Sequence, residues 1–235
     1  MDTGWKSYPK NTDDRIVIDE LIRSERKTLQ LSISPEGRLI VRAPIRMPMK
    51  RIRQFVEDNR EWIEKHRRRA LERKKNALPE KFREGECIYF LGKPLKLQSW
   101  DGKCFCQQED MLLFPRQLLE EPITCLEQWY RTRAREYIFE RLKHYSARTG
   151  IGFSAFRITS ARRRWGSCSS KDSLNFTWRL IRAAPRAIDY VVIHELCHVV
   201  HKNHSRNFWK LVESIMPDYR EQRNWLKENQ FLLDG

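Results

Sequence analysis

Two histidines and a glutamate near the C-terminus have the spacing of a metal-dependent catalytic site. The segment reads His194-Glu-Leu-Cys-His198. Side chains four residues apart lie on one face of a helix, about 5–6 Å from each other, so His194 and His198 can bind one zinc ion. Glu195 lies beside that pair, where its carboxylate can take a proton from water held by the metal. The pattern predicts metal-assisted hydrolysis with Glu195 as the general base.

A catalytic zinc ion needs a third protein ligand, and two later histidines are candidates for it. His201 shares the helical face of His194, but a continuing helix would carry it about 10 Å along the axis, too far for one ion to reach both. His204 follows Asn203, a residue type that commonly ends helices in the left-handed conformation. If the chain folds back there, His204 reaches the metal, so we favour His204 over His201.

Peptide hydrolysis also needs a group that stabilises the negative charge developing on the carbonyl oxygen. Arg164 and Tyr219 are candidates for this contact, although either side chain can equally serve the fold. Cys168 and Cys197 raise a different alternative, an inhibitory fourth ligand, since thiolates bind zinc. For Cys197 a small buried thiol is the simpler interpretation.

The motif requires a helix to carry it and a scaffold to hold that helix. Pro185 suits a first helical turn, and apolar residues at helical spacings follow it: Ile188, Val191, Val192 and Ile193. Ahead of this helix, residues 161–181 alternate apolar and polar side chains around a serine-rich turn, which predicts a β-hairpin. Another helix is expected over about 122–148, ending at Gly150.

The N-terminal half predicts short strands and one long helix. The helix is expected from about Met49 to Lys75, and the strands near 15–22, 28–34, 38–43, 87–91, 94–99, 103–107 and 110–114. This order of elements indicates an α+β fold. We expect an N-terminal β-rich lobe with a long basic helix over 14–115 and a metal-binding catalytic lobe over 116–235.

The 235-residue chain has a formal net charge of +15, and two segments account for most of it. Residues 48–76 carry a net +6 and residues 157–186 a net +7, whereas residues 187–235 carry −1. Basic surfaces of this kind attract polyanions such as nucleic acid or nucleotides. The charge therefore predicts how a substrate or nucleic acid reaches the site, and not which bond is broken.

Composition excludes several other classes of protein. Hydrophobic residues make up 40% of the chain, enough for a packed core. No apolar run approaches the ~20 residues of a membrane helix, and no secretory signal is evident, so we expect no membrane partner and a cytoplasmic protein. Six cysteines in 235 residues are too few for a disulfide framework.

A set of short segments extends the catalytic motif on both sides. They are Arg164-Trp-Gly-Ser-Cys-Ser169, Leu174-Asn-Phe176, Asp189-Tyr-Val-Val-Ile-His-Glu-Leu-Cys-His198, Asn203-His-Ser205, Phe208-Trp209, Pro217-Asp-Tyr219 and Trp225-Leu226. The set resembles the YgjP-like metallopeptidase family of zincins, over about 15–230 and more loosely in the N-terminal half. The resemblance implies a zincin-like catalytic lobe, one zinc ion held by His194, His198 and His204, Glu195 as general base, and a peptide or protein substrate.

The position of the third histidine narrows the resemblance further. Its spacing is also similar to that of SprT-like DNA–protein crosslink proteases, in which a third histidine follows a short turn. Metzincins share the spacing, but they have a glycine where this chain has His201, which argues against that class.

Two other functions are open from the sequence. A pyrophosphatase-type, metal-dependent nucleotide phosphoanhydride hydrolase would direct the arginines of 157–186 at phosphates, namely Arg162, Arg163, Arg164, Arg179 and Arg182, although no phosphate-loop motif is present. A zinc-containing nucleic-acid-binding module, or a protease associated with DNA, would use segments 48–76 and 157–186, with Trp165 and Trp178 stacking on bases. Four protein ligands would indicate a structural zinc site, whereas three ligands and an open position would indicate a hydrolase.

Overall fold

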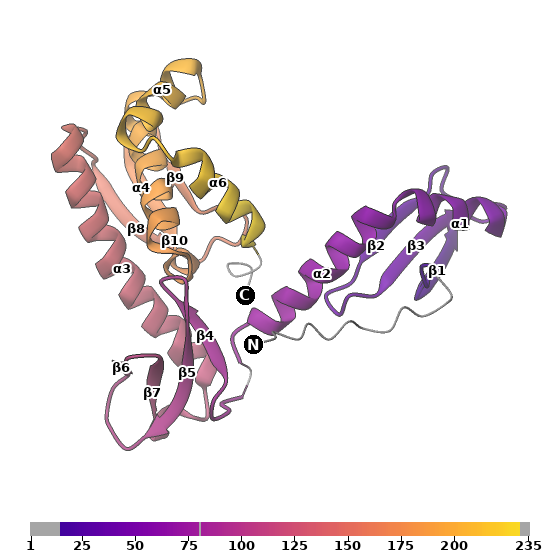
Figure 1. Cartoon of the computed structure of the whole chain (residues 1–235), viewed down its shortest axis with the longest axis horizontal. Coiled ribbons are helices and arrows are strands. Elements are labelled where there is room, and N and C mark those ends of the chain that lie inside the picture. The colour runs from indigo at the N-terminus through magenta and orange to yellow at the C-terminus, as the bar shows by residue number, and fades with distance from the viewer. Residues whose placement is uncertain (1–14, 80, 231–235) are drawn as a thin grey trace, which may run out of the picture. The chain divides into compact units, whose positions relative to one another are not determined.

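The computed structural model describes residues 15–79 and 81–230. These residues form two compact units, which divide between Lys74 and Lys75. Each unit has its own hydrophobic core. Helices and short strands occur in both units, which confirms the expected α+β fold (Figure 1).

The smaller unit contains a three-stranded sheet. Its strands are β1 (Glu20–Ser24), β2 (Gln30–Ile33) and β3 (Leu39–Pro44). β3 lies in the middle, parallel to β1 and antiparallel to β2. Because side chains alternate across a strand, β3 presents Leu39, Val41 and Ala43 to one face, where all three are buried in the core of this unit.

The single basic helix expected from Met49 to Lys75 is wrong, because the structure has two helices there. They are α1 (Met49–Asp58) and α2 (Arg60–Asn76), separated by Asn59. The side-chain amide of Asn59 donates to the carbonyl of Phe55 at 2.8 Å, and its backbone has left the helical region at φ −110°. Asparagine side chains bond to nearby backbone and so compete with the helix.

The larger unit begins with a four-stranded sheet made of β4 (Cys87–Phe90), β5 (Lys93–Trp100), β6 (Cys106–Gln108) and β7 (Met111–Pro115). The strand order is β4-β5-β7-β6, with β5 parallel to β7. The buried side chains of this sheet and of α3 (Pro122–Thr149) belong to one hydrophobic core. The Tyr130 hydroxyl on α3 also donates to the carbonyl of Tyr89 on β4, at 2.7 Å. The sheet and α3 therefore lie in one compact unit, while the expected lobe boundary at 115 and 116 stays a prediction.

The sheet next to the catalytic motif contains β8 (Ala155–Thr159), β9 (Gly166–Cys168) and β10 (Ser173–Thr177). β9 and β10 pair antiparallel, which confirms the expected hairpin, and β8 pairs parallel to β10. The second arm of the hairpin is shorter than expected. It ends at Thr177, and the chain continues as a buried 3-10 turn, Trp178–Arg182, that packs along α3.

The remaining helices are α4 (Pro185–Val200), α5 (Arg206–Ile215) and α6 (Tyr219–Glu228). α4 packs along α3, and the two are joined by an ion pair in which the guanidinium of Arg141 donates to both carboxylate oxygens of Asp189, at 2.6 and 2.9 Å (Figure 1). α3 ends as expected, because Gly150 takes the left-handed conformation at φ 73°. Among the described residues, none of the helices has the length and apolar character needed to span a membrane.

Candidate metal centre

The helix that carries the motif is buried over most of its length. Pro185 occupies its first turn, as expected, and residues 187–193 and 195–197 are buried. The first turn with Pro185 and Arg186, the face with His194 and His198, and the C-terminal end are more open to solvent. Three of the predicted functional side chains therefore project from a helix that is fixed by the core.

α4 ends earlier than a left-handed Asn203 would require. Its last residue is Val200, and His201 follows in an extended conformation, with φ −125° and ψ 104°. The side-chain oxygen of Asn203 instead accepts from the backbone N–H of Ser205 at 3.3 Å. Ser205 caps α5, since its hydroxyl oxygen accepts from the N–H of Phe208. The chain does fold back before His204, through bends at Lys202 and Asn203 that need no left-handed residue.

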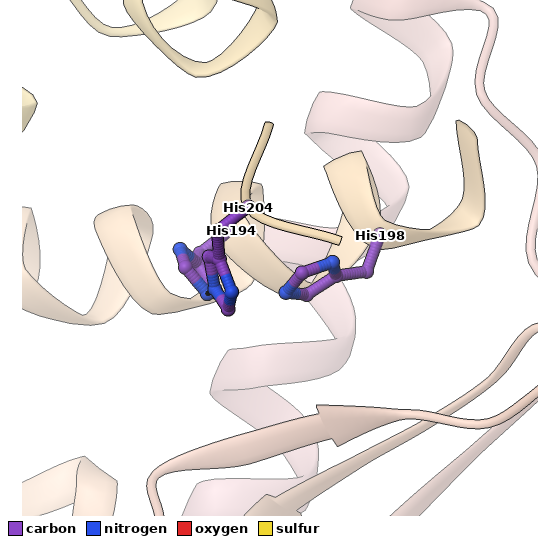
Figure 2. A group of neighbouring side chains, drawn as sticks. All are labelled: His194, His198 and His204. Atoms are coloured by element: carbon purple, nitrogen blue, oxygen red, sulfur yellow. Dashed lines mark hydrogen bonds between the residues drawn. The ribbon is translucent and has the colours of Figure 1, made fainter. Parts of the chain in front are cut away.

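The structure brings the three favoured histidines together (Figure 2). One ring nitrogen of each of His194, His198 and His204 lies within 4.8 Å of the others, and the Nε2 atoms of His194 and His204 are 3.0 Å apart. Two nitrogen ligands on a tetrahedral zinc ion, at 2.0–2.1 Å from it, are about 3.3 Å from each other. The three-histidine donor set can therefore hold one metal ion.

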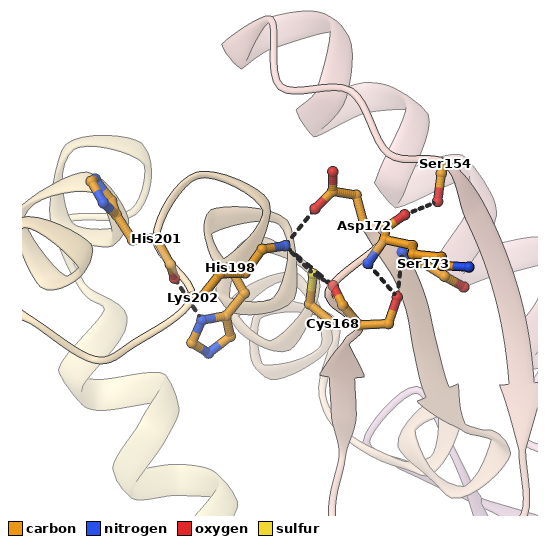
Figure 3. Close-up of polar contacts among 9 residues, drawn as sticks. Ser154, Cys168, Asp172, Ser173, His198, His201 and Lys202 are labelled. Carbon is orange, nitrogen blue, oxygen red and sulfur yellow. Dashed lines mark hydrogen bonds and ion pairs between the residues drawn. The ribbon is translucent and has the colours of Figure 1, made fainter.

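His201 does not join this cluster through its side chain. Figure 3 shows its imidazole directed away from that of His198. Its carbonyl oxygen, in contrast, accepts a hydrogen bond from Nδ1 of His198 at 2.9 Å. A carbonyl can only accept, so Nδ1 of His198 carries the proton and its Nε2 is left as the metal-binding atom.

The surroundings of His194 and His204 favour the neutral imidazole, which is the form of histidine that binds metals. Burial, together with the charges that His198 and His204 would carry, lowers the pKa of His194 to about 3. The pKa of His204 is also lowered, first by partial burial and then by His198 and Arg223. The Tyr190 hydroxyl lies 3.5 Å from Nδ1 of His194, at the outer limit of a hydrogen bond.

Glu195 is buried against β9. Its side chain is buried, and this burial raises the pKa of its carboxyl group to about 8, against the opposing effect of the positive charge on Arg164. The backbone of Gly166 passes directly over it. A β-carbon at residue 166 would lie 2.6 Å from Cγ and 2.8 Å from Oε1 of Glu195. Only glycine therefore lets β9 approach the carboxylate.

Replacing Gly166 by alanine is expected to move Glu195 or β9. The overlap with Cγ should lower the free energy of unfolding by ~1–3 kcal/mol, as over-packing of a tight site does. Catalytic turnover should also fall, because the carboxylate leaves its position beside His194. Chemical denaturation and peptidase assays on the purified variant measure the two effects.

Gly152→Ala is the matched control, since a β-carbon there meets nothing within 4 Å. It should leave turnover unchanged. Equal losses in the Gly152 and Gly166 variants would show that the contact with Glu195 does not matter.

The two predicted transition-state groups lie in different surroundings. Arg164 is exposed, and its charge acts on the carboxyl group of Glu195. Tyr219 is buried, its ring stacks on that of Trp209 at 5.4 Å, and its hydroxyl accepts from Nε of Arg220 at 3.1 Å. Both assignments stay predictions.

Sequence reasoning missed three residues at the site: Gly166, Tyr190 and Arg223. Arg223 lies on α6 with its guanidinium 5.1 Å from the ring centre of Trp209, and its charge lowers the pKa of both His194 and His204. Gly166 lies within the Trp-Gly-Ser segment, so the sequence offered a signal for it. Arg223 offered none, because its place depends on how α6 packs.

The cysteines lie outside the candidate ligand set. Among the described residues, that set consists of the three histidines alone. Cys197 is fully buried, and this burial raises the pKa of its thiol to about 12, which agrees with a packed thiol. The Cys168 thiol lies 3.6 Å from Nζ of Lys202, and partial burial raises its pKa as well.

A glutamate buried beside a three-histidine cluster defines the type of site found in metal-dependent hydrolases. The family comparison agrees, since residues 27–229 match the family described as YgjP-like, metallopeptidase domain. The chain therefore belongs to the YgjP-like family and is a metallopeptidase, which confirms the family, the enzyme class and the general function expected from the sequence. No curated protein matches the chain.

Two solved structures are similar to part of the chain. One is the metallopeptidase zymogen of Pyrococcus abyssi abylysin, with 21% identity and a TM-score of 0.36, covering 40% of this chain and 95% of that one. The other is the metallopeptidase zymogen of Methanocaldococcus jannaschii jannalysin, with 16% identity and a TM-score of 0.34, covering 41% of this chain and 96% of that one.

Proposed function

We propose that this metallopeptidase cleaves extended peptide segments, with one zinc ion bound by His194, His198 and His204 and with Glu195 as the general base. The observation that carries the proposal is the convergence of the three ring nitrogens within 4.8 Å beside a buried carboxylate. Three protein ligands, and not four, are the number typical of a catalytic zinc site.

The rings of two of the histidines that would hold the metal are already oriented by contacts within the chain. His198 is fixed by its bond to the His201 carbonyl, and the ring of His194 packs edge-on against Phe208, with 4.9 Å between the ring centres. Zinc in such a site supplies a Lewis acid that makes water acidic near neutral pH and polarises a carbonyl group.

Glu195 moves the proton in this proposal. In its ionised form, the carboxylate accepts a proton from the attacking water as the C–O bond forms. It then donates that proton to the amine nitrogen as the peptide C–N bond breaks. Gly166 and the core residues of α4 exclude bulk water from the carboxylate, and in such surroundings electrostatic interactions are stronger.

β9 is suited to hold the substrate. It lies at the edge of its sheet and pairs only with β10 among the described strands. An extended peptide can add to such an edge through backbone hydrogen bonds. Since Gly166 in β9 lies against Glu195, a peptide on this edge runs past the general base.

The cation or hydroxyl that stabilises the developing oxyanion comes from Arg164, Tyr219 or Arg223. Arg223 joins the two earlier candidates because its positive charge acts on both His194 and His204. The hydroxyl oxygen of Tyr219 accepts from Arg220, which leaves its O–H proton able to donate to an oxyanion.

Two of the arginines that a phosphoanhydride hydrolase would use are not available to a substrate. Arg179 and Arg182 are 3% and 1% exposed, whereas Arg162, Arg163 and Arg164 are exposed. The burial disfavours the nucleotide alternative. A nucleic-acid partner for the basic segments 48–76 and 157–186 stays a prediction.

The substrate class can be tested directly. The zinc-loaded protein should hydrolyse unstructured, casein-type peptides and should lose that activity when a chelator removes the metal. A panel of nucleoside triphosphates should be left intact under the same conditions. Release of pyrophosphate or phosphate, with no peptide cleavage, would replace the proposed function by the phosphoanhydride alternative.

A further inference from the structure

The loop between α4 and α5 is tied to the turn between β9 and β10 by one lysine (Figure 3). Nζ of Lys202 forms an ion pair with the carboxylate of Asp172 and donates to the carbonyl of Ser169 at 3.2 Å. It also lies 3.6 Å from Sγ of Cys168. One ammonium group therefore links Lys202 to residues that lie thirty or more positions earlier in the sequence.

The turn that receives this ammonium group is itself well ordered by hydrogen bonds. The Ser169 hydroxyl oxygen accepts from the backbone N–H groups of Lys171 and Ser173, at 3.2 and 3.1 Å. Asp172 takes the left-handed conformation at φ 58°, which aspartate tolerates better than most residues. The turn therefore positions the groups that accept from Lys202 through hydrogen bonds of its own.

The loop that carries Lys202 supplies two parts of the candidate metal site. The carbonyl that fixes the His198 ring belongs to the peptide bond between His201 and Lys202. His204, which brings the third ring, lies two residues further on, and Ser205 then starts α5. A shift of residue 202 is therefore expected to displace both His198 and His204.

We propose that Lys202 is a positioning residue for the metal site: its ammonium group holds the loop 201–204 against the β9–β10 turn, and so fixes His198 and His204. The inference rests on the proposed function. It also assigns a use to Asp172, which the catalytic mechanism does not employ. Exposed ion pairs add little to the stability of a fold, so the contact is expected to act on metal binding and not on folding.

Lys202→Met tests the proposal, because methionine keeps the length of the side chain and removes its charge. Zinc affinity, measured by competition with a chromophoric chelator, should fall about tenfold, the lower end of the loss seen when partners of metal ligands are removed. The thermal midpoint of the metal-free protein should not change. Lys202→Arg should recover part of the affinity.

Lys171→Met is the matched control. Lys171 lies in the same turn and is exposed, and its side chain has no ion pair among the described residues. It should bind zinc as the wild type does. If the two methionine variants bind zinc equally well, Lys202 has no positioning role.

Asp172→Asn separates the ion pair from other effects of the lysine, since asparagine also tolerates a positive φ. The single variant should weaken zinc binding, and the double variant Asp172→Asn with Lys202→Met should bind no worse than Lys202→Met alone. Additive losses would overturn the proposal. A wild-type protein that binds no zinc would instead contradict the proposed function.

Discussion

Glu195→Gln is expected to lower kcat for peptide hydrolysis by about 10²–10⁴-fold, the usual contribution of a general base. Glutamine has nearly the size and shape of glutamate, so it fits the pocket under Gly166. Its amide does not accept a proton at neutral pH. Zinc should stay bound, because Glu195 lies beside the three-histidine set and is not part of it. Steady-state kinetics and metal analysis of one preparation measure both effects.

Glu221→Gln provides the comparison for a loss of negative charge. Glu221 is an exposed residue in the first turn of α6, and its variant should keep wild-type kcat. Full hydrolysis by Glu195→Gln would remove Glu195 from the mechanism. Loss of zinc together with activity would mean that Glu195 supports the metal site and not the proton transfer.

His204→Ala is expected to weaken zinc binding by more than ~100-fold, since it removes a ligand and not merely a partner of one. Peptide hydrolysis should be lost at zinc concentrations that saturate the wild type. The fold should survive, because His204 is exposed, whereas Phe208, which packs beside it and fixes α5, is buried in the core. Isothermal titration with zinc, followed by an activity assay, gives the result.

His201→Ala distinguishes the two histidines that compete for the third position. It removes an imidazole that points away from the cluster and keeps the backbone carbonyl that binds His198 (Figure 3). This variant should bind zinc and cleave peptides as the wild type does. The reverse pattern, with His201→Ala inactive and His204→Ala active, would show that the ligand set is wrong.

Much of the architecture follows from local sequence signals. Alternating apolar residues in 38–43 and 173–177, and Gly150 after a helical pattern, depend on neighbours within a few residues, so the strands and the end of α3 were predictable. The pairing of His194 with His198 follows from helical geometry in the same way. The convergence of His204 was also expected, although the chain turns through bends at Lys202 and Asn203 and not through a left-handed Asn203.

Other features depend on contacts between distant parts of the chain, which no local pattern reports. The approach of Gly166 to Glu195 requires β9 to lie on α4, and the Lys202–Asp172 ion pair requires the hairpin turn to reach the loop after α4. The break at Asn59 arises from a local hydrogen bond. The apolar residues on both sides of it continue at helical spacing, however, so the pattern predicted one helix. The burial of Arg179 and Arg182 was likewise not expected, because charged side chains are usually exposed.

The side chains of the site come from two kinds of segment. His194, Glu195 and His198 share a helix whose backbone is buried, whereas His204 comes from the short segment between α4 and α5. Substitutions in that segment can alter how long the metal stays bound without moving the proton acceptor. Metal affinity can therefore change while the position of the proton acceptor is preserved, and evolution can tune the dependence of the enzyme on metal supply in this way.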